Sequence, residues 1–135
     1  GSGEAMLAAM ALGAEGVQIG TLFALSAESS ASEAFKQRCL ALDEGGTMLC
    51  LKKLSPTRLV RNGLFDKVAE AEARGANSEE LRDILGKAAS KRGIFEGDTE
   101  QGELEIGQIA SSVDAIPPET SCGNSWKTFG KHRRR

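Results

Sequence analysis

The chain has 135 residues, a net charge of −2 at pH 7 and an aromatic content of 4% with no Tyr. These values argue against a specific nucleic-acid binder, which would carry a basic surface and aromatic side chains that stack on bases. No apolar run approaches the ~18 residues of a membrane span, so we expect no membrane partner. The length fits one domain but is well below the ~250 residues of a complete eight-stranded α/β barrel.

The cysteines and the histidine show no spacing that is typical of a catalytic or metal-binding site. Cys39, Cys50 and Cys122 are far apart in the sequence and form no CxxC pair. This spacing predicts free, packed thiols in a reducing compartment, so we expect a cytoplasmic protein. The single histidine, His132, lies in the tail, and we therefore predict no metal site.

The first predicted element is a helix over residues 4–12, rich in Ala, Leu and Met, that ends at Gly13. Residues 17–19 form a short apolar stretch and are predicted to be a buried strand. A capping box formed by Ser30 and Glu33 predicts that a second helix begins there. The remaining predicted elements are an extended segment over 47–54 that a turn at Ser55-Pro56 ends, polar helices over 64–74 and 78–92, a Gly-rich loop over 93–102 and a helix over 103–113. Gly75 is predicted to end the first polar helix, and Asn77 is predicted to cap the second.

The number of candidate strands is too small for a complete sheet. Only the stretch 17–19 and the extended segment 47–54 qualify. A strand cannot satisfy its own edges, and a two-stranded piece is marginal on its own. We therefore expect an α/β domain of which this chain is one part.

Residues 18–21, Gln-Ile-Gly-Thr, lie at the carboxyl end of the first predicted strand. Gly20 has no Cβ, so a phosphate can approach its backbone closely. Thr21 adds a hydroxyl and an N–H, and the start of a following helix would add a partial positive charge. An α/β barrel holds phosphate at such a place. The alternative is that Gly20 only permits a turn.

Residues 3–23, GEAMLAAMALGAEGVQIGTLF, resemble a stretch of the nitronate monooxygenase (2-nitropropane dioxygenase-like) flavoenzyme family. FMN-dependent enoyl-acyl-carrier-protein reductases are close relatives of that family. Further matches follow in the family's order at residues 28–30, 34–36, 55–62 and 102–108, so the resemblance covers roughly residues 1–116.

The resemblance implies the C-terminal part of a TIM (β/α)8 barrel that carries FMN, with a mainly helical lid. Residues 1–46 would be the last helix-strand-helix unit of the barrel with its FMN phosphate loop, and residues 47–113 would be the lid. Residues 114–135 are interpreted as an irregular basic tail. Because residues 119–124 depart from the family's terminal helix, we hypothesise a local frameshift there.

The resemblance also assigns site residues. Gln18, Ile19, Gly20 and Thr21 match the family's second phosphate loop. The family's first phosphate loop, its catalytic histidine and its flavin-ring contacts have no counterpart here, so no catalytic residue is predicted in this chain. Gly107 and Gln108 are candidates for positions near the flavin, and the alternative is a helix-packing Gly and an exposed Gln. Two arginines in the proposed lid, Arg58 and Arg61, would face either an anionic ligand or solvent.

The function implied is FMN-dependent oxidative denitrification of alkyl nitronates with O2. The alternative within enzymes is enoyl-acyl-carrier-protein reduction, which would use NAD(P)H and an enoyl thioester. A third hypothesis is a truncated, non-catalytic chain that acts as a binding or assembly partner. A homodimer is included among the expected partners.

Overall fold

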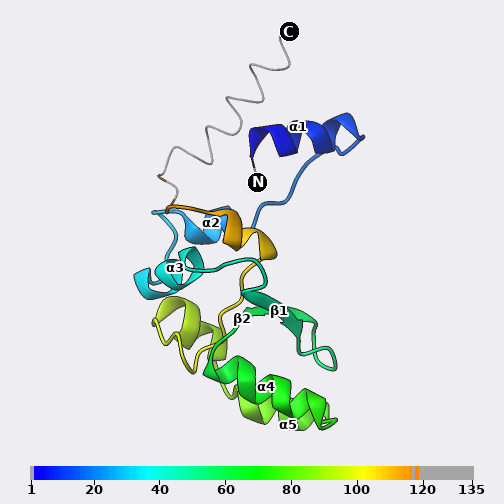
Figure 1. The fold of residues 1–135 in the computed structure, drawn as a ribbon, viewed down its shortest axis with the longest axis vertical. Helices are drawn as coiled ribbons and strands as arrows, with labels where there is room; N and C mark the ends of the chain where they lie inside the picture. Colours follow the sequence, from blue (N-terminus) through cyan, green and yellow to red (C-terminus); the bar gives the residue numbers. More distant parts are fainter. Residues whose placement is uncertain (1, 117, 119–135) are drawn as a thin grey trace.

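A computed structural model describes residues 2–116 and 118 (Figure 1). The described part of the molecule is elongated, with α1 toward one end and the α4–α5 pair at the other, and the chain after α5 returns to lie beside α2 and α3 (Figure 1). The bounds of the elements are α1 Gly3–Ala11, α2 Thr21–Leu25, α3 Glu33–Leu40, β1 Thr47–Cys50, β2 Thr57–Val60, α4 Gly63–Ala73, α5 Ser78–Leu85, the π-helical turn η1 Lys91–Phe95 and the 3-10 helix η2 Gln108–Ser112.

The hairpin β1–β2 is an antiparallel two-stranded sheet in which Thr47 pairs with Val60 and Leu49 pairs with Arg58. Directly paired residues point to the same face of an antiparallel sheet. Leu59 lies between Arg58 and Val60 and points to the opposite face. An isolated bridge from Leu59 to Glu105 brings a later segment against β2.

The two faces of the hairpin serve two separate cores. Val60 belongs to the first, which α2, α3 and residues 104–110 complete. Leu59 belongs to the second, which α4 and α5 complete. Neighbouring side chains of β2 point to opposite faces of the sheet, so this one strand contributes to both hydrophobic clusters. Members of the first core are Leu25, Ala31, Phe35, Cys39, Leu42, Val60, Leu104, Ile106 and Ala110, and those of the second are Cys50, Leu51, Leu59, Phe65, Val68, Ala71, Ala76 and Leu81.

Side-chain caps begin the longer helices where the sequence supplies Ser or Asn. Asn77 accepts hydrogen bonds from the backbone N–H groups of Glu79 and Glu80, and the Glu80 carboxylate accepts from the Asn77 N–H, which completes a capping box. The predicted cap of α3 was wrong. Its N-cap is Ser32, whose hydroxyl accepts from the Phe35 N–H, and the predicted Ser30 lies before the helix.

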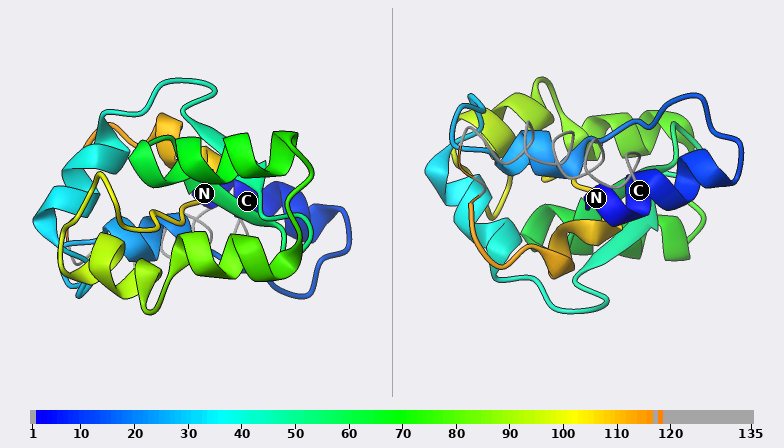
Figure 2. Two further views of the ribbon diagram at one scale, coloured as in Figure 1. Left: turned by 90° about the horizontal axis from the view of Figure 1, so that it is seen from below. Right: turned by 90° about the horizontal axis from the view of Figure 1, so that it is seen from above.

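Glycines end two helices as predicted. Gly13 after α1 and Gly75 after α4 have φ values of 99° and 88°, the left-handed region that suits Gly just beyond a helix. The α4–α5 pair that Gly75 connects lies side by side at the end facing the viewer in the left view of Figure 2. The helix predicted over 78–92 is shorter than expected, because Gly86 at φ 67° ends α5.

Three other expectations about secondary structure were wrong. Residues 17–19 form no strand, since no neighbouring strand in the described part of the chain offers them backbone partners. Residues 57–60 form β2, which the turn signal at Ser55-Pro56 concealed. Residues 103–113 do not form an α-helix. Glu105 bridges to β2 instead, and only the 3-10 helix η2 follows.

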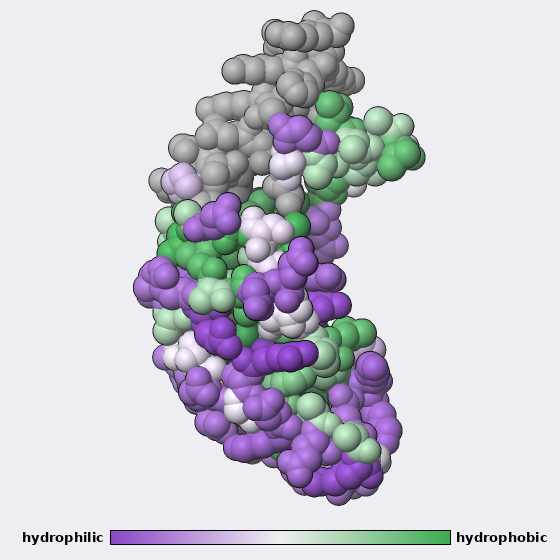
Figure 3. Space-filling view, in the orientation of Figure 1, coloured by the Kyte–Doolittle hydropathy of each residue, from purple (hydrophilic) through white to green (hydrophobic). Residues whose placement is uncertain are grey.

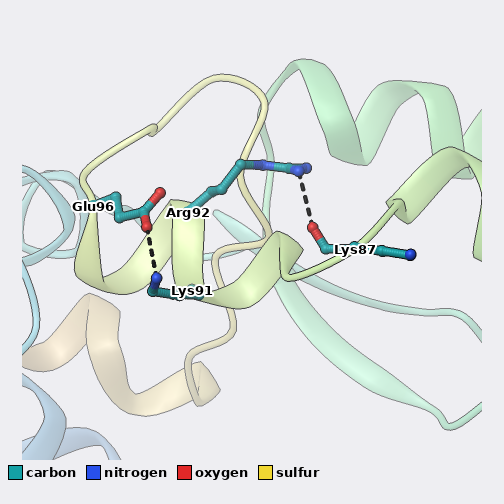
Figure 4. Close-up of polar contacts among 4 residues, drawn as sticks. All are labelled: Lys87, Lys91, Arg92 and Glu96. Atoms are coloured by element: carbon teal, nitrogen blue, oxygen red, sulfur yellow. Dashed lines mark hydrogen bonds and ion pairs between the residues drawn. The ribbon is translucent and has the colours of Figure 1, made fainter.

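In the π-helical turn η1, the backbone of Gly93 lies against the backbone of Gly102. A Cβ on Gly102 would collide with the backbone of Gly93, and a Cβ on Gly93 would lie 2.5 Å from the Glu103 carbonyl oxygen. Exposed contacts border this turn (Figure 4). Lys91 Nζ lies 3.2 Å from Glu96 Oε1, and Arg92 Nη1 donates to the Lys87 carbonyl oxygen at 3.0 Å. Such exposed pairs contribute little stability.

The expectations for the tail cannot be compared with the structure. Residues 119–135 lie outside the described residues, and they contain the proposed frameshift, Cys122 and His132. The described helices are all too short or too polar to cross a lipid bilayer.

Candidate functional site

A cleft of about 580 Å³ lies where α2, β2 and the segment after η1 meet. Its walls combine apolar side chains with a few polar groups, which is the usual character of a small-molecule site. The lining residues are Gln18, Gly20, Thr21, Ala24, Arg58, Ile94, Glu105, Ile106 and Gly107.

The predicted phosphate loop forms one wall of this cleft. Gly20 is the N-cap of α2, and Thr21 is its first residue, so a short helix begins directly after this loop. Gly20 has φ −101°, which any residue adopts, and a Cβ there would meet no protein atom within 4 Å. Neither backbone conformation nor packing therefore requires glycine here. The absence of a side chain at Gly20 leaves its backbone accessible from the cleft.

Thr21 and Gly107 come together from opposite ends of the chain. Thr21 is 7% exposed, and its Oγ1 lies 2.6 Å from where a Cβ on Gly107 would stand. Gly107 must therefore lack a side chain for the Thr21 hydroxyl to occupy its position. That hydroxyl forms no hydrogen bond to another described residue, so it keeps its donor for a group in the cleft.

Two of the predicted site residues lie apart from the cleft wall. Gln108 lines a second hollow of about 650 Å³ between η2 and the loop before β1. Ile19 is half-buried in the connection to α2 and is absent from the residues that line the cleft. The structure thus gathers Gln18, Gly20 and Thr21 with Gly107, and it separates them from Gln108.

Sequence reasoning missed most of the opposite wall. Ala24, Ile94, Glu105 and Ile106 carry no motif, because apolar and acidic residues of this kind occur all along the chain. Arg58 was weighed as a ligand contact or a solvent-exposed side chain, and it lines the cleft. Only the fold, which brings β2 beside α2, reveals this wall.

The cleft contains no thiol among its described lining residues. The two described cysteines are buried in the cores. Burial raises the pKa of the Cys39 thiol to about 12, with a small opposing effect from Arg38. Burial, reinforced by the Glu72 and Glu103 carboxylates, raises the pKa of Cys50 to about 11. Both thiols therefore stay protonated at neutral pH and are unsuited to nucleophilic work. The described residues contain no cluster of three or more His, Cys, Asp or Glu side chains able to hold a metal ion.

Among solved structures, the chain is similar to FabK from Thermotoga maritima. The TM-score is 0.83 at 31% sequence identity, and the match covers 98% of this chain and 42% of that one. A point mutant of the same FabK matches with a TM-score of 0.74, 29% identity, and coverage of 98% of this chain and 40% of that chain.

Comparison of sequences points the same way. The chain is 28% identical over 152 aligned positions to (3aS,4S,5R,7aS)-5-hydroxy-7a-methyl-1-oxo-octahydro-1H-indene-4-carboxyl-CoA dehydrogenase of Mycobacterium tuberculosis H37Rv, covering 85% of this chain and 43% of that protein. The chain thus spans less than half the length of these relatives.

The family model "Nitronate monooxygenase" matches residues 1–122. That family consists of FMN-dependent oxidoreductases. The described helices and the two-stranded sheet correspond to part of its barrel fold. The chain therefore belongs to the nitronate monooxygenase family.

Proposed function

We propose that this chain provides the phosphate end of the FMN site in an oxidoreductase that oxidises alkyl nitronates. The observation that carries the proposal is the contact of Thr21 with Gly107 beside the open backbone of Gly20. A phosphate needs converging donors without side chains in the way, and this corner of the cleft supplies them. Gln18 lies on the same wall and would add an amide donor.

FMN, when bound, supplies the electron transfer between a substrate and oxygen, and the protein supplies placement. In this chain Gly20 and Thr21 would hold the phosphate, and Gly107 would keep the Thr21 hydroxyl in position. Ala24, Ile94 and Ile106 would exclude water from the part of the cleft beside the phosphate.

The test is FMN binding by Thr21→Ala and Thr21→Ser, measured by titration calorimetry and by the change in flavin fluorescence. Thr21→Ala removes one donor to a charged group, so we expect it to weaken FMN binding by about 1.5–3 kcal/mol. Thr21→Ser keeps the hydroxyl and serves as the control, with most of the affinity retained. FMN affinity equal to wild type in Thr21→Ala would rule out this role for Thr21.

A second candidate activity is the reduction of an enoyl thioester with NAD(P)H. Two of the relatives favour it: FabK, which belongs to the reductase branch, and a protein whose name specifies a carboxyl-CoA dehydrogenase. Assays on the chain extended to the length of its relatives distinguish the two activities. Oxygen consumption with an alkyl nitronate supports the first, and NAD(P)H oxidation that depends on an enoyl thioester supports the second.

The third candidate is a non-catalytic role for the chain by itself, which is proposed here as the alternative to both activities. Thermal unfolding of the isolated chain addresses it. A broad, non-cooperative transition with a dye-binding apolar surface would favour it, because an incomplete barrel leaves core side chains uncovered. A sharp transition that FMN moves upward would contradict it.

A further inference from the structure

We infer that Arg58 is a second phosphate-binding residue of the cleft, whose guanidinium offsets part of the charge of the dianion held by Gly20 and Thr21. This inference rests on the proposed FMN function. It assigns a specific side chain of the hairpin to the cofactor, whereas the sequence motif of the phosphate loop lies entirely within residues 18–21.

The register of the hairpin directs Arg58 toward the cleft. Arg58 and Val60 point to the same face of β2, and Val60 is fully buried in the first core beside Ile106. Arg58 therefore extends over the edge of that core, where the cleft opens. Leu59, on the opposite face, belongs to the second core, so a register shift of one residue would remove the guanidinium from the cleft.

Hydrogen bonds already orient this guanidinium. Arg58 Nη1 donates to the carbonyl oxygen of Thr47 at 3.2 Å and to Thr47 Oγ1 at 3.3 Å. Nε and Nη2 donate to no other described residue. The side chain is thus held at one nitrogen and keeps donors for a ligand. A fixed planar fork loses less entropy on binding an anion than a mobile Lys would.

The charges of the cleft show why a cation is needed. Of its described lining residues, Arg58 and Glu105 carry formal charges, and no ion pair joins the two. Without Arg58 the lining would carry only the negative charge of Glu105, which repels a phosphate dianion. Because Arg58 forms no ion pair with Glu105, its guanidinium remains available to the phosphate.

The experiment compares FMN with riboflavin, which lacks only the phosphate, in the full chain and in Arg58→Gln. Binding is followed by flavin fluorescence and by amide chemical shifts. We expect Arg58→Gln to weaken FMN binding about tenfold or more while riboflavin binding stays constant, because only the phosphate contact is lost. Wild-type preference for FMN should also weaken with added salt, and this dependence should be smaller in Arg58→Gln.

The matched control is Arg61→Gln, which removes the same charge from an exposed residue outside the cleft lining. It should leave both affinities unchanged. Thr47→Val gives an independent check, because it keeps the Arg58 charge and removes one of its acceptors. It should weaken FMN binding in the same direction but less than Arg58→Gln does. Thermal unfolding with and without ligand shows which variants are folded.

The outcomes separate the inference from the function on which it rests. If Thr21→Ala loses FMN affinity but Arg58→Gln does not, the role of Arg58 is overturned and the phosphate site stands. Equal losses of FMN and riboflavin affinity in Arg58→Gln would also overturn it, since they indicate a general distortion of the cleft. If wild type shows no preference for FMN over riboflavin, both proposals fail.

Discussion

The α4–α5 end and the segment from Leu12 to Gly20 differ in how well their backbone polar groups are hydrogen-bonded and how well their apolar side chains are buried. In the α4–α5 pair, Asn77 caps its helix, and apolar side chains such as Val68 and Leu81 are fully buried. In the segment 12–20 the backbone is irregular, and Leu12 and Val17 are 91% and 39% exposed. Figure 3 shows the same contrast, with a largely hydrophilic surface over α4–α5 and more apolar surface toward α1.

The difference shows that local signals suffice where partners are close in sequence. A helix forms its hydrogen bonds within itself, and α4 packs against α5 through a short connection at Gly75. A strand needs a neighbour, and the described residues offer none to residues 17–19. The proposed phosphate site at Gly20 and Thr21 therefore belongs to the region that depends on longer-range contacts.

The largest expected difference between the two regions is in the free energy of unfolding lost by Leu81→Ala and by Leu12→Ala. Leu81 is fully buried in the second core, so its truncation should lower the free energy of unfolding by about 2–5 kcal/mol. Leu12 is almost fully exposed, so the same truncation should change it by less than about 0.5 kcal/mol. Urea unfolding measures both. A loss in Leu12→Ala as large as that in Leu81→Ala would contradict the exposure of Leu12 and, with it, the contrast between the two ends.

The sequence predicted those parts of the fold that have local causes. The helix ends at Gly13 and Gly75 and the cap at Asn77 follow from backbone geometry and short-range hydrogen bonds. The strand β2 and the bridge at Glu105 could not be predicted, because their partners lie elsewhere in the chain. Pairing across that distance leaves no periodic signal in such short segments.

The candidate site divides in the same way. Gly20 and Thr21 were proposed from the sequence because a phosphate would impose special residue types on a short loop, and both line the cleft. Gly107 was found through the resemblance, and the structure adds the physical reason, which is the position of the Thr21 hydroxyl. Ile94 could not have been found. It lies in the π-helical turn and lines the cleft, and no motif in the sequence marks that turn.

An intermediate effect is expected in how the free energy of unfolding depends on pH through the one buried thiol in each of the two cores. The pKa of Cys39 in the first core rises to about 12 and that of Cys50 in the second to about 11, from an ordinary value of 9.0. Below pH 9 the thiols stay protonated in the folded and the unfolded chain, so the free energy of unfolding does not change through them. Above pH 9 the thiols of the unfolded chain lose protons that the folded chain retains. Stability should therefore fall by up to about 1.4 kcal/mol per pH unit for each thiol.

The measurement is urea unfolding between pH 8 and 11 for the wild type, Cys39→Ala and Cys50→Ala. Each substitution should reduce the slope of stability against pH, whatever it does to stability at pH 8. The absence of Tyr simplifies this range, since no phenol titrates in it. An unchanged slope in both variants would contradict the assignment of buried, protonated thiols.

The smallest effect concerns the N-caps of the two regions, Asn77 of α5 and Ser2 of α1. Asn77→Ala removes the acceptor for two N–H groups and breaks the capping box, so it should lower the free energy of unfolding by about 1 kcal/mol. The Ser2 hydroxyl accepts one bond, from the Ala5 N–H at 3.2 Å, in a helix whose buried residues are only Gly3 and Met6. Ser2→Ala should therefore fray α1, seen as faster amide exchange, without changing the global transition. A global loss in Ser2→Ala as large as that in Asn77→Ala would show that α1 is part of the cooperative unit, and the contrast between the two ends would then lie in the connection 12–20 alone.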